Sequence, residues 1–317
     1  MRSDIRRSAC LVFLCFATTL LHAQTLRERV TEYRAARQSG RNGEPDDGSA
    51  AGITLPPGVR VLHDVAYGGE REQRMDVYLP PHADKAPVIL MVHGGGWRRG
   101  DKRMATVVQN KLNRWVPEGF IFVSVDYRLL PEATPDVQAQ DVAKALATAQ
   151  AKAAAWGGDP EKFILMGHSA GAHLVALLSA APALAYDMGA KPWLGTVALD
   201  SAALDVARIM ESPHLSLYDQ PFGTDPAYWK KVSPLHVLTA AARPVLAVCS
   251  TRRAASCDQA HAFVDKANNM GLYAEVLEED MAHGEINERL GLPSAYTDAV
   301  ESFMSTLDPV VGQRLTH

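Results

Sequence analysis

The sequence has little of what marks several large classes of protein. Its formal net charge is only −4, so no excess of one sign draws the chain toward nucleic acid or an anionic membrane surface. No internal repeat recurs at the periods typical of solenoids. The apolar run Ala9–Leu21 spans only 13 residues, too few for a comfortable membrane crossing. With these classes excluded, the composition is that of a globular protein, and 317 residues suffice for one large domain.

The apolar run belongs to a distinct N-terminal segment. Arg2, Arg6 and Arg7 precede it, and Ala23 supplies a small residue for cleavage. This order is typical of a secretory signal peptide, here residues 1–23, with an uncleaved N-terminal anchor as the alternative. We therefore expect export to the periplasm or the medium. Residues 24–54, polar after a short helix near Leu26–Arg37, are expected to form a mobile leader to the folded domain at 55–317.

Cysteine is equally scarce, with four in the whole chain. Cys10 and Cys15 leave with the signal peptide, so only Cys249 and Cys257 stay in the exported protein. An even pair in an oxidising compartment favours a disulfide, and two separate thiols are the alternative.

From residue 59 onward, apolar strand-like runs alternate with helical patterns. Such alternation predicts an α/β fold with a mainly parallel, eight-stranded sheet and helices on both faces. The expected strands are 59–65, 75–78, 87–92, 120–125, 163–166, 196–199, 244–250 and 274–277, and the expected helices are 104–117, 137–156, 170–180 and 259–269. Ligand sites in such sheets lie beyond the carboxyl ends of the strands.

Two glycine-rich motifs stand at strand ends of this kind. Gly167-His168-Ser169-Ala170-Gly171 follows an apolar run and precedes a helical one, the context of a nucleophile elbow that exposes a serine hydroxyl. Upstream, His93-Gly94-Gly95-Gly96-Trp97 also ends a strand. Acyl transfer builds negative charge on a carbonyl oxygen, and backbone N–H groups of such a loop can stabilise it. We assign this oxyanion hole to Gly95, Gly96 and Ala170, while Trp97 either lines the acyl pocket or closes the loop.

The chain resembles α/β-hydrolases of the carboxylesterase type, near the hormone-sensitive-lipase and feruloyl-esterase-like groups. The resemblance is carried by His93–Trp97, Ser124–Glu132 and Gly157–Pro160 leading into the elbow, and it extends over residues 55–305. It implies hydrolysis of small-molecule carboxylic esters through a serine acyl-enzyme, without a metal or organic cofactor. It also implies that Asp126-Tyr127-Arg128 is a structural ion-pair network near the glycine loop.

A serine nucleophile needs a base, and in this fold the order along the chain is serine, acid, histidine. His283 lies in the segment Glu278–Glu285 that directly follows the last predicted strand, and it is the expected base. The acid is less clear, because no carboxylate stands just after the seventh strand, where related esterases carry theirs. Asp258 is the first choice, presented by a loop that the disulfide folds back, with Asp200 and Asp205 after the sixth strand as alternatives.

The predicted function is therefore that of an exported serine esterase. Formamide or feruloyl-ester cleavage on the same site is an alternative, as is a weakly active or vestigial binding protein that lacks its acid. The proline-rich stretch of residues 205–238 is expected to form a partial cap over the site.

Overall fold

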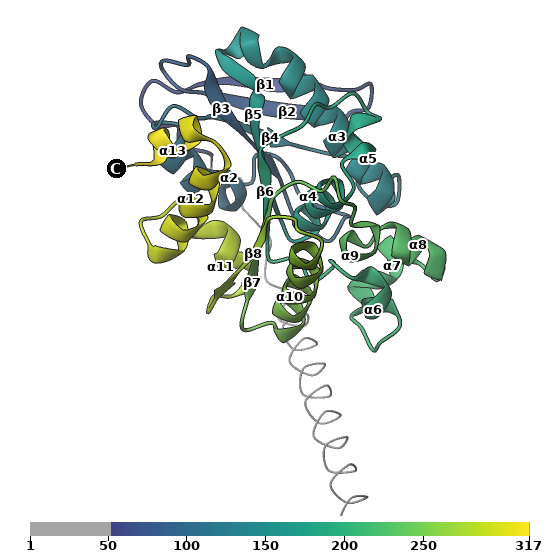
Figure 1. Ribbon diagram of the computed structural model, residues 1–317. Coiled ribbons are helices and arrows are strands. Elements are labelled where there is room, and N and C mark those ends of the chain that lie inside the picture. Colours follow the sequence, from purple (N-terminus) through teal and green to yellow (C-terminus); the bar gives the residue numbers. More distant parts are fainter. Residues whose placement is uncertain (1–51, 317) are drawn as a thin grey trace, which may run out of the picture.

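A computed structural model describes residues 52–316 and contains one eight-stranded sheet (Figure 1). The strand order is β1-β2-β4-β3-β5-β6-β7-β8, in which β2 pairs antiparallel with β1 and β4 while all other pairs are parallel. The mainly parallel eight-stranded sheet predicted from the sequence is confirmed. The strands are β1 Arg60–Ala66, β2 Arg74–Leu79, β3 Ala86–Val92, β4 Ile121–Val125, β5 Gly158–His168, β6 Gly195–Leu199, β7 Val245–Ser250 and β8 Ala274–Glu279.

Helices cover both faces of the sheet (Figure 1). One face packs against α2, α12 and α13, with α11 beside them, and the other against α3, α4 and α10. The central strands β3, β4, β6 and β7 are buried along their whole length, as expected of parallel strands covered on both sides. The bounds are α2 Ala105–Trp115, α3 Pro135–Lys152, η1 Ala153–Trp156, α4 Ala170–Ala180, α5 Ala183–Tyr186, α10 Ala254–Asn269, α11 His283–Glu288, α12 Ala295–Leu307 and α13 Pro309–Leu315.

Between β6 and β7 the chain leaves the sheet and forms short helices, seen as the green group at the right of Figure 1. They are α6 Val206–Met210, η2 Ser216–Tyr218, α7 Asp219–Phe222, α8 Pro226–Lys231 and α9 Pro234–Val237. Because this segment coincides with the predicted cap, we call residues 205–238 the cap segment.

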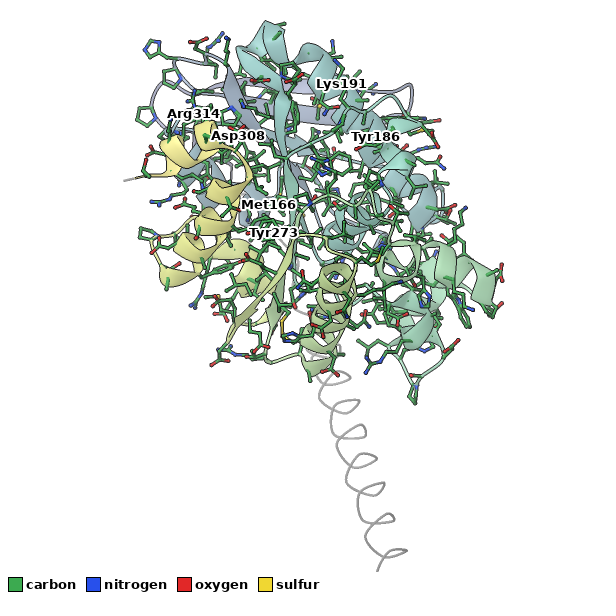
Figure 2. The ribbon with its side chains drawn as sticks, in the orientation of Figure 1. Met166, Tyr186, Lys191, Tyr273, Asp308 and Arg314 are labelled. Atoms are coloured by element: carbon green, nitrogen blue, oxygen red, sulfur yellow. A yellow bond between two sulfur atoms is a disulfide. The ribbon has the colours of Figure 1, made fainter. Side chains whose placement is uncertain are left out.

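The C-terminal helix α13 is fixed to the sheet by polar contacts (Figure 2). Asp308 at its start forms an ion pair of 2.7 Å with Lys162, and Arg314 near its end donates to the carbonyls of Gly119 and Asp84, at 3.1 Å each. Met166 of β5 lies fully buried in the middle of the molecule (Figure 2). The end of the described chain is thus tied to the loops before β3 and β4.

The predicted signal peptide, and the leader as far as residue 51, lie outside the described residues. Within residues 52–316, none of the helices has the length and apolar character that a membrane crossing needs.

Candidate active site

Ser169 stands at a sharp turn between β5 and α4. Its φ of 55° is unusual for a residue with a side chain, and such strain is kept only where the surroundings enforce it. The turn also brings the start of α4 against β3: a Cβ added to Gly171 would lie 2.2 Å from the carbonyl oxygen of Val92. The second glycine of the motif is therefore required by close backbone approach, and the predicted elbow geometry is present.

His283, the first residue of α11, joins Ser169 to a carboxylate. Its Nε2 lies 2.9 Å from Ser169 Oγ, and its Nδ1 lies 2.6 Å from Asp200 Oδ2. The three side chains come from the ends of β5, β6 and the loop after β8, at the carboxyl edge of the sheet. Hydroxyl, imidazole and carboxylate are thus joined by an unbroken chain of hydrogen bonds, the arrangement that can activate a serine nucleophile.

Asp200 directly follows β6 and is fully buried, so its charge must be balanced by donors. Oδ1 accepts from the Ser250 N–H at 2.9 Å and from the Ser256 hydroxyl at 2.5 Å. Oδ2 accepts from His283 and, at 2.5 Å, from Nη1 of Arg253. Burial alone would raise the pKa of Asp200, but the hydrogen bond from His283 and the charge of Arg253 outweigh it and hold the pKa far below its usual value. Asp200 is therefore ionised at every pH of interest.

The expectation that Asp258 partners His283 is corrected by this arrangement. Helix α10 begins at Ala254, five residues before the predicted start, so Asp258 lies inside the helix with a side chain 62% exposed. Its ion-pair partner is Arg208 of the cap segment, at 3.6 Å. Asp205, the second alternative, accepts from the Arg208 N–H at the start of α6 and from His236. Of the three candidate acids, only Asp200 contacts the histidine.

The predicted disulfide between Cys249 and Cys257 is present. It joins the end of β7 to the first turns of α10 and closes the loop Ser250–Ser256. In place of the predicted role of presenting Asp258, this loop supplies donors to Asp200. Its cystine packs with the buried side chains beneath α10.

His168, which precedes the serine, supports the base. Its Nε2 lies 3.0 Å from the carbonyl oxygen of His283, and the two rings are 4.5 Å apart between centroids. Burial holds the pKa of His168 well below its usual value, so the ring is neutral and Nε2–H donates to that carbonyl. The sequence pattern singled out this residue only as a neighbour of Ser169. Its contact with a loop 115 residues away gave no local signal.

The glycine loop after β3 carries the predicted oxyanion-hole residues Gly95 and Gly96, and Ala170 is the first residue of α4. The N–H of a first helical residue has no acceptor within its helix. Gly95 has a φ of 112°, and a Cβ there would lie 2.1 Å from the Arg99 carbonyl oxygen. Only glycine fits this turn.

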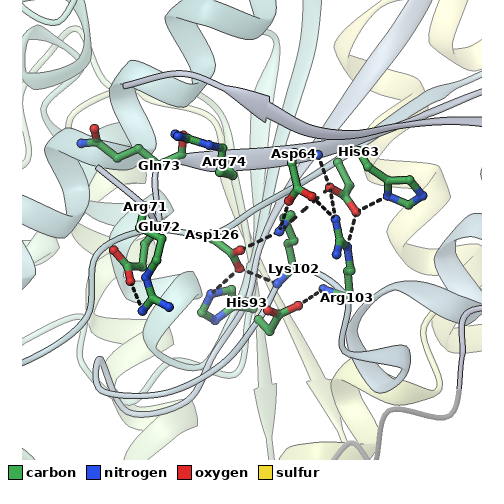
Figure 3. Close-up of polar contacts among 12 residues, drawn as sticks. His63, Asp64, Arg71, Glu72, Gln73, Arg74, His93, Lys102, Arg103 and Asp126 are labelled. Atoms are coloured by element: carbon green, nitrogen blue, oxygen red, sulfur yellow. Dashed lines mark hydrogen bonds and ion pairs between the residues drawn. The ribbon is translucent and has the colours of Figure 1, made fainter. Parts of the chain in front are cut away.

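Charged residues behind the loop anchor it to the sheet (Figure 3). Lys102 donates from its backbone N–H and its Nζ to Asp126, at 2.6 and 2.9 Å. Arg103 donates from Nε to the fully buried Asp76 at 2.7 Å and pairs with Asp64 at the same distance. Asp126 therefore joins the ion-pair network that the resemblance implied.

Arg128, the second charged residue of Asp126-Tyr127-Arg128, lies outside this network. Arg128 pairs with Asp141 of α3 at 2.7 Å, and Tyr127 donates from its hydroxyl to the His93 carbonyl at 3.0 Å. The tripeptide is thus structural, but its two charges serve different contacts.

Trp97 closes the loop against the cap segment. Its ring is 97% buried, with centroids 4.9 Å from Phe222 and 6.0 Å from Tyr218. Its Nε1 donates to Nδ1 of His173 at 3.2 Å, while His173 Nε2 donates to the Val232 carbonyl at 2.7 Å. Burial lowers the pKa of His173 to about 4, so the ring is neutral and can make both contacts at once. A single histidine thus links the glycine loop, α4 and the cap segment.

Comparison with known proteins agrees with this fold. Residues 75–189 match the BD-FAE family. The crystal structure of esterase B from Lactobacillus rhamnosis superposes with a TM-score of 0.67 at 17% identity, over 91% of this chain and 98% of that one. The chain has the α/β-hydrolase fold.

Two curated relatives match this chain in sequence. A probable isoprenylcysteine alpha-carbonyl methylesterase of Oryza sativa subsp. japonica is 35% identical over 118 residues, 37% of this chain and 28% of the relative. Esterase LipQ of Mycobacterium tuberculosis is 37% identical over 118 residues, 36% of this chain and 28% of the relative. The match thus spans under a third of the length of either relative.

Nothing in residues 52–316 gathers three His, Cys, Asp or Glu side chains as ligands for a metal ion. The groups that the structure brings into contact at the described site are the Ser169 hydroxyl, the His283 imidazole and the Asp200 carboxylate.

Proposed function

We propose that this α/β-hydrolase cleaves carboxylic esters through an acyl-enzyme on Ser169, with His283 as general base and Asp200 as the acid that orients it. The observation that carries the proposal is the hydrogen-bonded chain from Ser169 Oγ through both ring nitrogens of His283 to Asp200 Oδ2. A free serine hydroxyl is a poor nucleophile. The hydrogen bond to His283 provides a base that can accept the proton of the hydroxyl.

In the first half-reaction His283 Nε2 takes the Ser169 proton while Oγ forms a bond to the ester carbonyl carbon. The carbonyl π electrons move onto oxygen, where the N–H groups of Gly95, Gly96 and Ala170 stabilise the charge. When the tetrahedral intermediate collapses, the bond to the alcohol oxygen breaks, and that oxygen takes the proton back from His283. Asp200 holds the Nδ1–H tautomer throughout and stabilises the imidazolium.

In the second half-reaction His283 takes a proton from water, whose oxygen attacks the acyl carbon. The bond to Ser169 Oγ breaks, the serine recovers its proton from His283, and the carboxylic acid leaves. No cofactor enters either step.

The names of the relatives support ester hydrolysis, and one of them names a methyl ester. The alternative of a vestigial binding protein depended on the lack of a catalytic acid. The contact between Asp200 and His283 supplies a carboxylate, so that reason no longer holds. Feruloyl-ester and formamide cleavage would use the same residues, so they belong in the substrate panel of the test.

The test is hydrolysis of methyl, aryl and feruloyl esters and an N-formyl amide by the purified protein and by Ser169→Ala. Ester hydrolysis that falls to the uncatalysed rate in Ser169→Ala supports the proposal, and the fastest substrate assigns the acyl and alcohol classes. Ser305→Ala is the matched control, because its hydroxyl donates to the Glu301 carbonyl within α12. Ester hydrolysis that survives Ser169→Ala would refute the proposal.

We also propose that the protein is exported. The Cys249–Cys257 disulfide supports this, because disulfides persist in oxidising compartments and are rare in the cytosol. Expression of the full chain followed by fractionation and N-terminal sequencing tests it: a mature N-terminus near Gln24 in the exported fraction is expected. Unprocessed protein confined to the cytosol would contradict it.

A further inference from the structure

The loop Ser250–Ser256 carries the donors to Asp200 other than His283. Ser250 N–H and the Ser256 hydroxyl bind Oδ1, while Arg253 binds Oδ2. The same loop also reaches the segment before the base, because the Ser250 hydroxyl donates to the Met281 carbonyl at 2.6 Å. One loop, closed by the disulfide, therefore sets the position of the acid relative to the histidine.

Arg253 occupies an unusual position within this loop. Its Nη1 lies 2.5 Å from Asp200 Oδ2 and 2.7 Å from His283 Nδ1, so it meets both ends of the acid–base hydrogen bond. A guanidinium is always charged and has no acceptor. While His283 is neutral, the carboxylate holds Arg253 and the imidazole side by side. Once the imidazole takes the Ser169 proton, two cations share one carboxylate.

Other charged and titratable groups near His283 lie on several neighbouring elements. His168 at the end of β5 is neutral, since burial keeps its pKa well below the usual value. Glu285 in α11 is engaged by Arg252, Arg289 and the Ala282 N–H. From α2, Lys111 binds the backbone and side-chain oxygens of Asn287, and burial lowers its pKa to about 7. Of the residues described, Asp200 and Arg253 are the two charged groups in direct contact with the His283 ring.

We propose that Arg253 is a positioning residue that divides the charge of Asp200 between itself and His283, and so sets the acidic limit of catalysis. The inference rests on the proposed function of Ser169, His283 and Asp200. Asp200 favours the imidazolium form of His283, which cannot accept a proton from serine, and Arg253 opposes that form. Arg253 therefore keeps the base neutral to lower pH and helps the imidazolium return its proton to the departing alcohol.

The experiment measures kcat/KM against pH for the wild type, Arg253→Met and Arg253→Lys. The methionine keeps an apolar stem but removes the charge, so the midpoint of the acidic limb is expected to move up by about one pH unit. This is the low end of the usual range, because the Arg253 side chain is 33% exposed. Arg253→Lys retains the charge and is expected to keep the midpoint within about 0.3 units.

Arg252→Met is the matched control. It removes the same charge one residue earlier, from a side chain that pairs with Asp280 and Glu285 on the surface. The midpoint of its acidic limb is expected to equal that of the wild type. That result would show that contact with the Asp200–His283 pair matters more than net charge.

A lower plateau in Arg253→Met with an unmoved midpoint would overturn the inference, because a purely structural role of the loop predicts that result. Arg253→Gln provides a second neutral variant should the methionine protein fail to fold, and the same two outcomes apply to it. Ser169→Ala in the same assay separates the two proposals. If Ser169→Ala is inactive and the midpoint does not move, only the role of Arg253 fails.

Discussion

Replacing Asp200 with asparagine should abolish most activity without changing the shape of the site. The amide has one acceptor, and the Ser250 N–H and the Ser256 hydroxyl both require it on the Oδ1 side. The amide N–H groups then face His283 Nδ1, which must give up its proton and place it on Nε2. In that tautomer the ring cannot take the Ser169 proton. We expect kcat to fall by about ten-thousand-fold, the loss seen for the same change in another triad, or about 5 kcal/mol of transition-state stabilisation.

The assay is steady-state hydrolysis of an aryl ester at pH 8, with urea unfolding to show that the variant is folded. Asp258→Asn is the matched control, because its exposed carboxylate pairs with Arg208 and does not contact His283. It is expected to stay within about two-fold of the wild type, as surface changes usually do. A folded Asp200→Asn variant that retained a tenth of the activity would refute the assignment, and a large loss in Asp258→Asn would restore the original choice.

Three further predictions concern stability. The folded pKa of His173 is about 4 against a usual 6.5, so the unfolded chain binds a proton first as the pH falls. The free energy of unfolding should drop by about 3 kcal/mol more between pH 6.5 and 4 in the wild type than in His173→Gln, and equal slopes in urea titrations would argue against a neutral histidine. Changing Cys249 and Cys257 together to serine should cost about 2.5 kcal/mol of unfolding free energy, and dithiothreitol should then affect only the wild type. Gly171→Ala should lose soluble yield, because its Cβ would lie 2.2 Å from the carbonyl of the last β3 residue, whereas Gly69→Ala, with open space around it, should express normally.

Most of the sheet could be predicted from the sequence because its strands are buried on both faces. Such strands appear as short apolar runs, for example Ala86–Val92 and residues 245–249, and both the number of strands and their mainly parallel arrangement follow from them. Helix α4, with a residue of high helix propensity at most positions, begins and ends at the predicted residues. The small helices of the cap segment carry no such periodic signal over three to six residues.

The start of α10 was predicted five residues late for a specific reason. Asp258 before Gln259 suits a helix N-cap, so the local pattern favours a start there. In the structure the helix begins at Ala254 without a side-chain cap. Tertiary contacts fix this turn instead: Ser256 binds Asp200, and Cys257 is bonded to Cys249. The sequence predicted the disulfide but could not predict that the loop it closes would contact a strand end 50 residues earlier.

The nucleophile and base could be assigned from the order of the chain, but the acid could not, because sheet topology allows two sources. Strands β6 and β7 are neighbours in a parallel pair, and β8 lies next to β7. Residues at the carboxyl end of either β6 or β7 can therefore reach a histidine that follows β8. What distinguishes them is charge. After β6 comes a carboxylate buried within a set of donors, and after β7 comes Arg253, whose cation meets that carboxylate. An acid at the end of β7 would face Asp200 across this same space, and two carboxylates in one buried site cannot both stay ionised. The arginine where the acid was expected is therefore consistent with an acid that directly follows β6. The sequence-based prediction, which put Asp258 first, did not use this signal.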